Sequence, residues 1–132
     1  MDRNSPSSPS LIDFVLRAFA VVIGVAVAAL SLGPQAGSEG VVSDKLVHFL
    51  SYLSFTYCAL LGFIGRPGRA PSVFRLAYAL VGMVVAGGAA IELLQILVGR
   101  ESSLLDGLAN AAGASLGLAL WLLTMRRGLQ QA

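Results

Sequence analysis

Four long apolar stretches, separated by short polar links, restrict the fold of this chain more than any other feature. They run from Leu11 to Leu32, Lys45 to Ile64, Val73 to Val98 and Leu104 to Met125. Each is long enough to cross the hydrocarbon core of a bilayer as a helix, which takes about 20 residues. A backbone in lipid must satisfy its own hydrogen bonds, and a helix does so within one segment. We therefore expect an all-α fold, a polytopic membrane bundle of four transmembrane helices.

The composition supports a membrane protein. Hydrophobic residues make up 56% of the chain and charged residues 12%, whereas about 25% of a typical soluble domain is charged. The mean hydropathy is +0.79. The net charge of +2 would suit a nucleic-acid partner, but the positions of the basic residues point to membrane topology instead, and we expect no nucleic acid. Cys58 is the only cysteine, which excludes an internal disulfide and a cysteine-based metal cluster.

The basic residues predict the orientation of the bundle, because Lys and Arg are enriched on the cytoplasmic side of membrane segments. Lys45 and Arg100 flank one end of the stretches, and the rest of the nine basic residues lie near the termini or the turn between the second and third stretches. We therefore expect both termini to be cytoplasmic and the links after the first and third stretches to face outward. The residues on the cytoplasmic side are Arg3, Arg17, Arg66, Arg69, Arg75, Arg126 and Arg127.

Residues 1–10 are rich in serine and proline, which predicts a disordered tail, and residues 11–127 are expected to form a single domain. The polar links are expected at residues 35–43 and 66–71. The first stretch has a rival interpretation as a cleavable signal peptide, because it is rich in Ala and Val and follows Arg3. No clean cleavage site flanked by small residues stands out in it, so we favour a membrane span.

The third and fourth stretches carry polar residues at helical spacing, on two faces. Ionisable groups inside membrane segments cost free energy, so by default they indicate a site. If the two helices fold back on each other, Glu92 lies level with Asn110, and Gln95 lies near Asp106. Glycines beside these pairs would let the two backbones approach closely, with Gly88 near Gly113. The faces consist of Gly88, Glu92, Gln95 and Gly99 on one helix, and Asp106, Asn110, Gly113 and Gly117 on the other. Between the helices, Gly99 and Arg100 predict a helix end, and Ser103 before Asp106 predicts an N-cap.

The second stretch adds polar residues at the same end. Lys45, His48 and Tyr52 follow the i, i+3, i+7 spacing of one helix face. A histidine near carboxylates is suited to act as a general acid or base. A metal site of His48 with Glu92 and Asp106 is chemically possible, but a single histidine and no thiolate make it the weaker interpretation. We expect no metal and no cofactor.

Each of these polar residues also has a structural interpretation. Glu92 and Asn110 would form a buried hydrogen-bonded pair that fixes the register of two helices. Asp106 would be a helix N-terminal charge, stabilised by the helix dipole. Lys45 would be an interfacial residue whose ammonium group reaches the membrane surface.

Three motifs, in this order, resemble the VanZ-like family of small bacterial membrane proteins. They are Asp44-Lys45-x-x-His48-Phe49, Glu92-x-x-Gln95 and Arg100-x-x-Ser103-x-x-Asp106-x-x-x-Asn110-x-x-Gly113. The resemblance covers residues 44–117 and leaves out the first stretch and the tail. It implies a multi-pass protein of the bacterial cytoplasmic (inner) membrane. The family takes its name from a protein linked to resistance to the glycopeptide antibiotic teicoplanin.

The residues and the resemblance together predict an extracytoplasmic polar pocket that binds a cell-envelope lipid or its head group. Two other classes stay open: an intramembrane acid–base enzyme acting on such a lipid, and a structural or interaction subunit. The expected partners are membrane lipids, including a lipid-linked envelope ligand, and the oligomeric state is not predicted. The candidate catalytic residues are His48, Glu92 and Asp106, and the candidate ligand-binding residues are Asp44, Lys45, Gln95, Arg100, Ser103 and Asn110, of which Lys45 and Arg100 would hold an anionic group.

Overall fold

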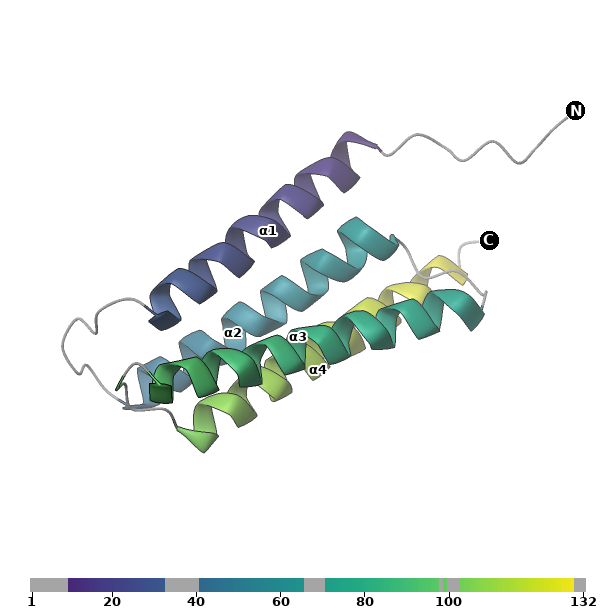
Figure 1. The fold of residues 1–132 in the computed structure, drawn as a ribbon. Coiled ribbons are helices and arrows are strands. Elements are labelled where there is room, and N and C mark those ends of the chain that lie inside the picture. The colour runs from purple at the N-terminus through teal and green to yellow at the C-terminus, as the bar shows by residue number, and fades with distance from the viewer. Residues whose placement is uncertain (1–9, 33–40, 66–70, 98, 100–102, 130–132) are drawn as a thin grey trace, which may run out of the picture.

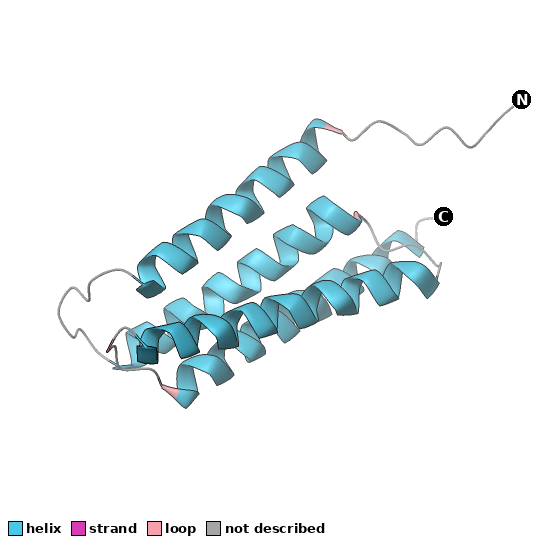
Figure 2. Cartoon of the chain, in the orientation of Figure 1, coloured by secondary structure: helices cyan, strands magenta, loops and turns pink. Residues whose placement is uncertain are grey.

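The computed structural model describes residues 10–32, 41–65, 71–97, 99 and 103–129 of the chain. These residues form helices α1 (Leu11–Leu32), α2 (Val41–Ala59), α3 (Pro71–Leu97) and α4 (Leu104–Leu129), and α2 continues into a π-helical turn, η1 (Leu60–Ile64). The described residues contain no strand (Figure 2). The predicted all-α fold is therefore confirmed for this part of the chain.

The helices run alternately up and down (Figure 1). At one end, which we call the link end, α1 and α3 finish and α2 and α4 begin; at the other, the terminal end, α1 begins and α4 finishes. Helix α2 packs most extensively against α4, and α1 lies against α2 and η1. No described residue of α1 contacts α4. Helix α1 is therefore an outer helix, attached to a bundle whose tightest pair is α2 and α4.

The predicted helix ends are confirmed within a few residues. The first predicted span coincides with α1, and α3 begins at Pro71 instead of Val73. Proline is favoured at the first position of a helix, where its missing N–H is not needed. Helix α4 passes the predicted end at Met125 and continues to Leu129. Arginine is a good helix former, and Arg126 and Arg127 are favoured near a helix C-terminus.

The predicted start of the second helix is wrong by several residues. Helix α2 begins at Val41, so residues 41–43, which we expected in a polar link, are helical. The physical reason is local: Val41 and Val42 are apolar, and no glycine or proline follows Gly40 to stop the helix. The predicted tail at residues 1–10 lies outside the described residues except for Ser10. Ser10 caps α1 by accepting the amide of Asp13 at 3.2 Å and donating its own amide to the Asp13 carboxylate at 2.9 Å.

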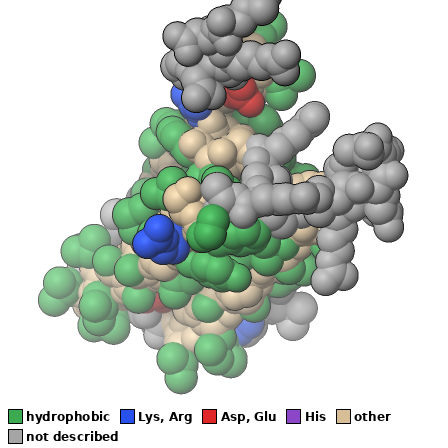
Figure 3. Space-filling view, turned by 90° about the vertical axis from the view of Figure 1, so that its right-hand side faces the viewer, with side chains coloured by type: hydrophobic (Ala, Val, Ile, Leu, Met, Phe, Trp, Pro, Cys, Tyr) green, Lys and Arg blue, Asp and Glu red, His purple; other side chains and the backbone are tan. Residues whose placement is uncertain are grey.

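The apolar side chains of these helices face outward, which is the reverse of a soluble domain. Leu76 is 61% exposed, Met83 69% and Leu93 63%, all on α3. Figure 3 shows hydrophobic side chains spread over most of the described surface on one side of the molecule. All four α-helices are long and apolar enough to cross a membrane. An exposed apolar surface of this extent indicates a multi-pass membrane protein.

Two glycines of α4 bring it into close contact with α2. A Cβ atom at Gly113 would overlap the carbonyl oxygen of Phe49, and one at Gly117 would lie 2.8 Å from the carbonyl oxygen of Leu53. This is the glycine spacing that lets membrane helices approach each other. We predicted that these glycines bring α4 close to α3, but the helix that they bring it close to is α2. Gly88 of α3 likewise faces α2, where it makes room for the ring of Tyr52.

The buried apolar residues form two clusters along the bundle axis. Tyr52, Val84 and Ala114 pack in the middle of the bundle. Leu60, Ala77 and Trp121 pack nearer the terminal end. Each cluster takes one residue from α2 or η1, one from α3 and one from α4, so together they hold the three helices in register.

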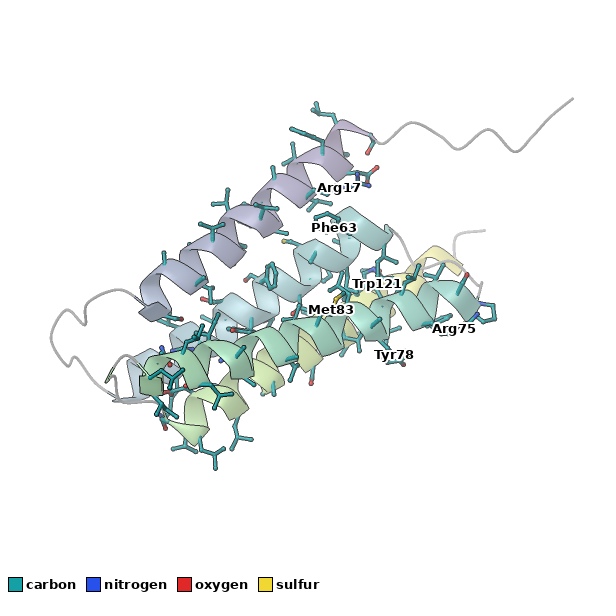
Figure 4. The ribbon with its side chains drawn as sticks, viewed as in Figure 1. Arg17, Phe63, Arg75, Tyr78, Met83 and Trp121 are labelled. Carbon is teal, nitrogen blue, oxygen red and sulfur yellow. The ribbon has the colours of Figure 1, made fainter. Side chains whose placement is uncertain are left out.

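The end of α2 is capped by side chains of its neighbours. The amide of Gly65 donates to the carbonyl of Leu60 at 3.0 Å, which closes the π-helical turn. Arg17 of α1 donates through Nε to the carbonyl of Gly62 at 2.5 Å, and its guanidinium lies 5.7 Å from the ring centroid of Phe63 (Figure 4). Trp121 of α4 donates to the carbonyl of Gly65 at 2.9 Å. A cation at a helix C-terminus is also favoured by the helix dipole.

Candidate functional site

Six polar side chains gather between the helices near the link end, and we call them the polar layer. Four of them are buried, with exposed fractions of 9% for Glu92, 6% for Gln95, 8% for Asp106 and 3% for Asn110. Asn110 lies about 9 Å inside the start of α4 at 1.5 Å per residue. The polar layer consists of Lys45 and His48 of α2, Glu92 and Gln95 of α3, and Asp106 and Asn110 of α4.

A hydrogen-bonded chain through Asn110 joins three helices. Its Nδ2 donates to Oε1 of Glu92 across a long distance of 3.5 Å. Its Oδ1 lies 3.0 Å from Nδ1 of His48. Because the amide oxygen can only accept, His48 Nδ1 carries a proton and donates it. The chain therefore runs from His48 through Asn110 to the carboxylate of Glu92, and the predicted pairing of Glu92 with Asn110 is observed.

Asp106 forms an ion pair with α2. Lys45 Nζ lies 3.0 Å from Asp106 Oδ1, and the two side chains are 26% and 11% exposed. The start of α4 is capped separately, by Ser103, whose Oγ accepts the amide of Leu105 at 3.2 Å. Asp106 is therefore a cross-helix partner as well as an acid in the first turn of α4. Because the two opposite charges are paired, the free-energy cost of burying each of them is lower.

Gln95 connects α3 to α1. Its Nε2 donates to the backbone carbonyl of Ser31 at 2.7 Å. The sequence placed Gln95 near Asp106, but Asp106 pairs with Lys45 and Gln95 binds α1. The role of Ser31 was not predicted, because its contact is made by a main-chain carbonyl that any residue would supply. The only sequence signal is a serine in the last turn of an otherwise apolar stretch.

The face of α2 that carries the polar layer continues inward. Tyr52 is 4% exposed and lies against Gly88, as its predicted place on the same face as Lys45 and His48 requires. Thr56, one turn further on, is fully buried, and its Oγ1 has no hydrogen-bond partner among the described residues. Thr56 was not predicted as a polar residue of interest, although the i+4 spacing from Tyr52 places it there.

Three predicted site residues take no part in the described contacts of the polar layer. Asp44 lies in the first turn of α2, but its side chain lies outside the described part, and Arg100 lies outside the described residues altogether. Ser103 is an N-cap. Within the described residues, no group of three His, Cys, Asp or Glu side chains is placed to hold a metal ion. The weaker metal interpretation of His48 with Glu92 and Asp106 therefore finds no geometric support there.

The polar layer is suited to bind and orient a polar group. Glu92 offers a carboxylate that accepts hydrogen bonds, and an ionised carboxylate at this depth is costly unless it has such partners. Asn110 fixes the orientation of both Glu92 and His48. An amide side chain transmits orientation but does not relay a proton, so Glu92 and His48 are separate hydrogen-bonding groups.

The Lys45–Asp106 ion pair makes a direct prediction about the register of α2 and α4. We expect Lys45→Asp to destabilise the bundle, because it places two carboxylates opposite each other, and Asp106→Lys to destabilise it through two ammonium groups. The double swap should recover about 1 kcal/mol of the combined loss, although a lysine at a helix N-terminus opposes the dipole. The coupling free energy from SDS titration of the four proteins measures this. A coupling of zero would mean that the two charges do not meet.

Comparison with known proteins does not identify a family for this chain. No family model, no curated protein and no solved structure matches the chain. The resemblance to the VanZ-like family stays a prediction, based on the ordered motifs in residues 44–117.

Proposed function

We propose that this protein is a VanZ-like membrane protein that binds the polar head group of a cell-envelope lipid at the polar layer. The observation that carries the proposal is the buried chain from His48 through Asn110 to Glu92. Interhelical hydrogen bonds stabilise membrane proteins by only about 0.6 kcal/mol on average. An ionisable residue inside a membrane segment costs free energy and by default indicates a functional site. Stability alone is therefore a weak reason for a carboxylate at this position.

The chemistry of the layer defines the kind of head group. Glu92 accepts hydrogen bonds, so it suits a hydroxyl or ammonium group of the ligand. Lys45 suits a phosphate, which would share the ammonium group with Asp106, and Arg100 would add a second cation of planar, bidentate geometry. The expected ligand is therefore an anionic phospholipid or lipid-linked phosphate that also carries a hydroxyl or amine. The distribution of basic residues favours an extracytoplasmic position for this site.

The test uses purified protein and two lipids of matched chains. We expect phosphatidylglycerol, which carries a phosphate and hydroxyls, to bind more tightly than phosphatidylcholine, which lacks the hydroxyls and carries a quaternary ammonium. Glu92→Gln and His48→Ala should each lower the affinity for phosphatidylglycerol by about 10-fold, as the loss of one hydrogen bond to a charged group predicts. Native mass spectrometry over a lipid titration measures the affinities. The matched controls are Leu93→Ala and Val47→Ala, neighbours whose side chains are 63% and 54% exposed.

Two outcomes would contradict lipid binding at this site. If phosphatidylglycerol binds equally to both site variants and the wild type, the polar layer does not hold its head group. If the variants lower the melting temperature and leave lipid affinity unchanged, the layer is structural. In that case the third class, a structural or interaction subunit, is the better interpretation.

A second candidate function, acid–base catalysis on the bound lipid, is favoured by the position of the His48 imidazole in the polar layer. Nδ1 of His48 lies 3.0 Å from Oδ1 of Asn110, which orients the ring, and an imidazole is suited to act as a general acid or base. For this function we expect a lipid product that disappears in His48→Gln, while phosphatidylglycerol still binds. Recovery of intact lipid after prolonged incubation with the wild type excludes turnover of that lipid.

A further inference from the structure

An apolar groove lies between α1, α3 and the end of α2. Its volume is about 530 Å³, within the range of about 300–1,000 Å³ that is usual for ligand sites. All of its lining residues are apolar or glycine, including Gly24, Phe55, Phe63, Met83 and Gly87. Phe63 is 54% exposed and Met83 69%, so the groove opens to the outer surface. Figure 4 shows these two residues on neighbouring helices.

Two hydrogen bonds join α1 to its neighbours on either side of the groove. Near the terminal end, Arg17 binds the carbonyl of Gly62, and at the link end Gln95 binds the carbonyl of Ser31. Between these contacts Gly87 has no side chain, and no atom lies within 4 Å of the position that its Cβ would occupy. Helix α1 is therefore joined to its neighbours at both ends, and at the level of Gly87 no side chain of α3 fills the space beside the groove.

The chemistry of the lining limits what can occupy the groove. A bound water molecule needs two to four polar partners, and the lining side chains offer none. The groove lies along the middle turns of helices that are long and apolar enough to cross a membrane. A second transmembrane helix, about 10 Å wide, does not fit between α1 and α3 along its whole length, because Gln95 and Ser31 bridge them. A hydrocarbon chain needs no polar partners, belongs at the depth of these middle turns, and is thin enough to lie between α1 and α3.

The groove and the polar layer lie at successive levels along α3. Val84 and Gly87, which line the groove, share a helix face with Gln95, at the i, i+3 and i+11 positions. Gln95 lies about 12 Å further along the helix than Gly87 at 1.5 Å per residue. The polar layer and the groove thus follow each other along the bilayer normal. The polar layer lies where the head group of a lipid would be, and the groove lies where its chain would be.

We propose that this groove binds one hydrocarbon chain of the lipid whose head group occupies the polar layer. The inference rests on the proposed function and deepens it, because it makes the ligand a long-chain amphiphile that enters sideways, from the bilayer, between α1 and α3. Chain length then contributes to recognition, in addition to the head group.

The test fills the groove at Gly87 and uses Gly82 as its matched control. Both glycines lie on α3 with no atom near their Cβ positions, but only Gly87 lines the groove. We expect Gly87→Leu to weaken binding of dipalmitoyl phosphatidylglycerol by about 10-fold, because the excluded chain loses its packing contacts. Binding of dihexanoyl phosphatidylglycerol, with the same head group and short chains, should not change. Gly82→Leu should bind both lipids as the wild type does, and Val25→Trp, which fills the groove from α1, should reproduce Gly87→Leu.

The outcomes separate this inference from the function on which it rests. If Gly87→Leu and Val25→Trp bind the long-chain lipid normally, and that binding still depends on Glu92, the chain lies elsewhere and the head-group site stands. If hexadecanol binds in a manner blocked by Gly87→Leu, while no lipid depends on Glu92 or His48, the groove holds a chain and the head-group site fails. Equal loss of both lipids in Gly87→Leu and Gly82→Leu would mean general damage to α3, and Val25→Trp on α1 would then decide, because normal binding of the long-chain lipid by that variant would overturn the groove site.

Discussion

Replacing Trp121 by alanine is expected to lower the free energy of unfolding by about 3–5 kcal/mol. Trp121 is fully buried against Leu60 and Ala77, and its indole N–H caps the carbonyl of Gly65. Lipid tails are as apolar as the protein interior, so little of this loss is hydrophobic transfer. It comes from the cavity, from lost dispersion contacts and from a carbonyl that loses its donor.

Two further variants separate these contributions. Trp121→Phe keeps much of the ring volume and removes the N–H, so we expect it to cost about 1 kcal/mol of hydrogen bonding and a smaller packing loss. Leu123→Ala is the surface control, because Leu123 is 50% exposed and faces outward. Unfolding is measured by SDS titration with far-UV circular dichroism, since Trp121 is the only tryptophan and its fluorescence disappears in both variants. A loss in Trp121→Ala no larger than that in Leu123→Ala would contradict the packing of this cluster.

Gly113→Ala is the second large change, with an expected loss of about 3 kcal/mol. The added methyl group overlaps the carbonyl oxygen of Phe49, which belongs to the backbone and moves only if α2 moves. Because Gly113 lies next to the turn that carries Asn110, we also expect the separation of α2 and α4 to weaken the contact between Asn110 and His48. Lipid binding at the polar layer should therefore fall together with stability.

The matched control for this change is Gly107→Ala on the same helix. No atom lies within 4 Å of a Cβ at Gly107, so alanine there should be neutral or should stabilise α4 by about 0.5–1 kcal/mol, through its higher helix propensity. SDS titration of both variants gives the comparison. Similar unfolding curves for the two variants would show that Gly113 is not a point of close backbone contact.

The sequence was sufficient to predict the elements of the fold and one of its polar contacts. Apolar length alone predicts four helices, and breakers such as Gly99, which has φ +75° after the end of α3, fix where they stop. Counting residues from the link between α3 and α4 predicts that Glu92 meets Asn110. Both inferences use distances along one helix or across one tight link, where geometry leaves few alternatives.

The sequence did not predict which helix each face meets. Spacing shows that Gly113 and Gly117 share a face, but α2, not α3, lies against it. For the same reason the hydrogen bond from Gln95 to α1 was not predicted. The contacts of α1 were not predicted at all, since Arg17 and Gln95 bind the main-chain carbonyls of Gly62 and Ser31. A carbonyl acceptor leaves no trace in the residue pattern.

The capped end of α2 has a consequence for how the chain is assembled during synthesis. Its carbonyls at Gly62 and Gly65 receive donors from Arg17 of α1, which precedes α2 in the chain, and from Trp121 of α4, which follows it. Until α4 has packed against α2, the carbonyl of Gly65 lacks its indole donor. The terminal end of α2 is thus completed only when helices on both sides of it in the chain are present, and a product truncated before α4 would leave the carbonyl of Gly65 without this donor.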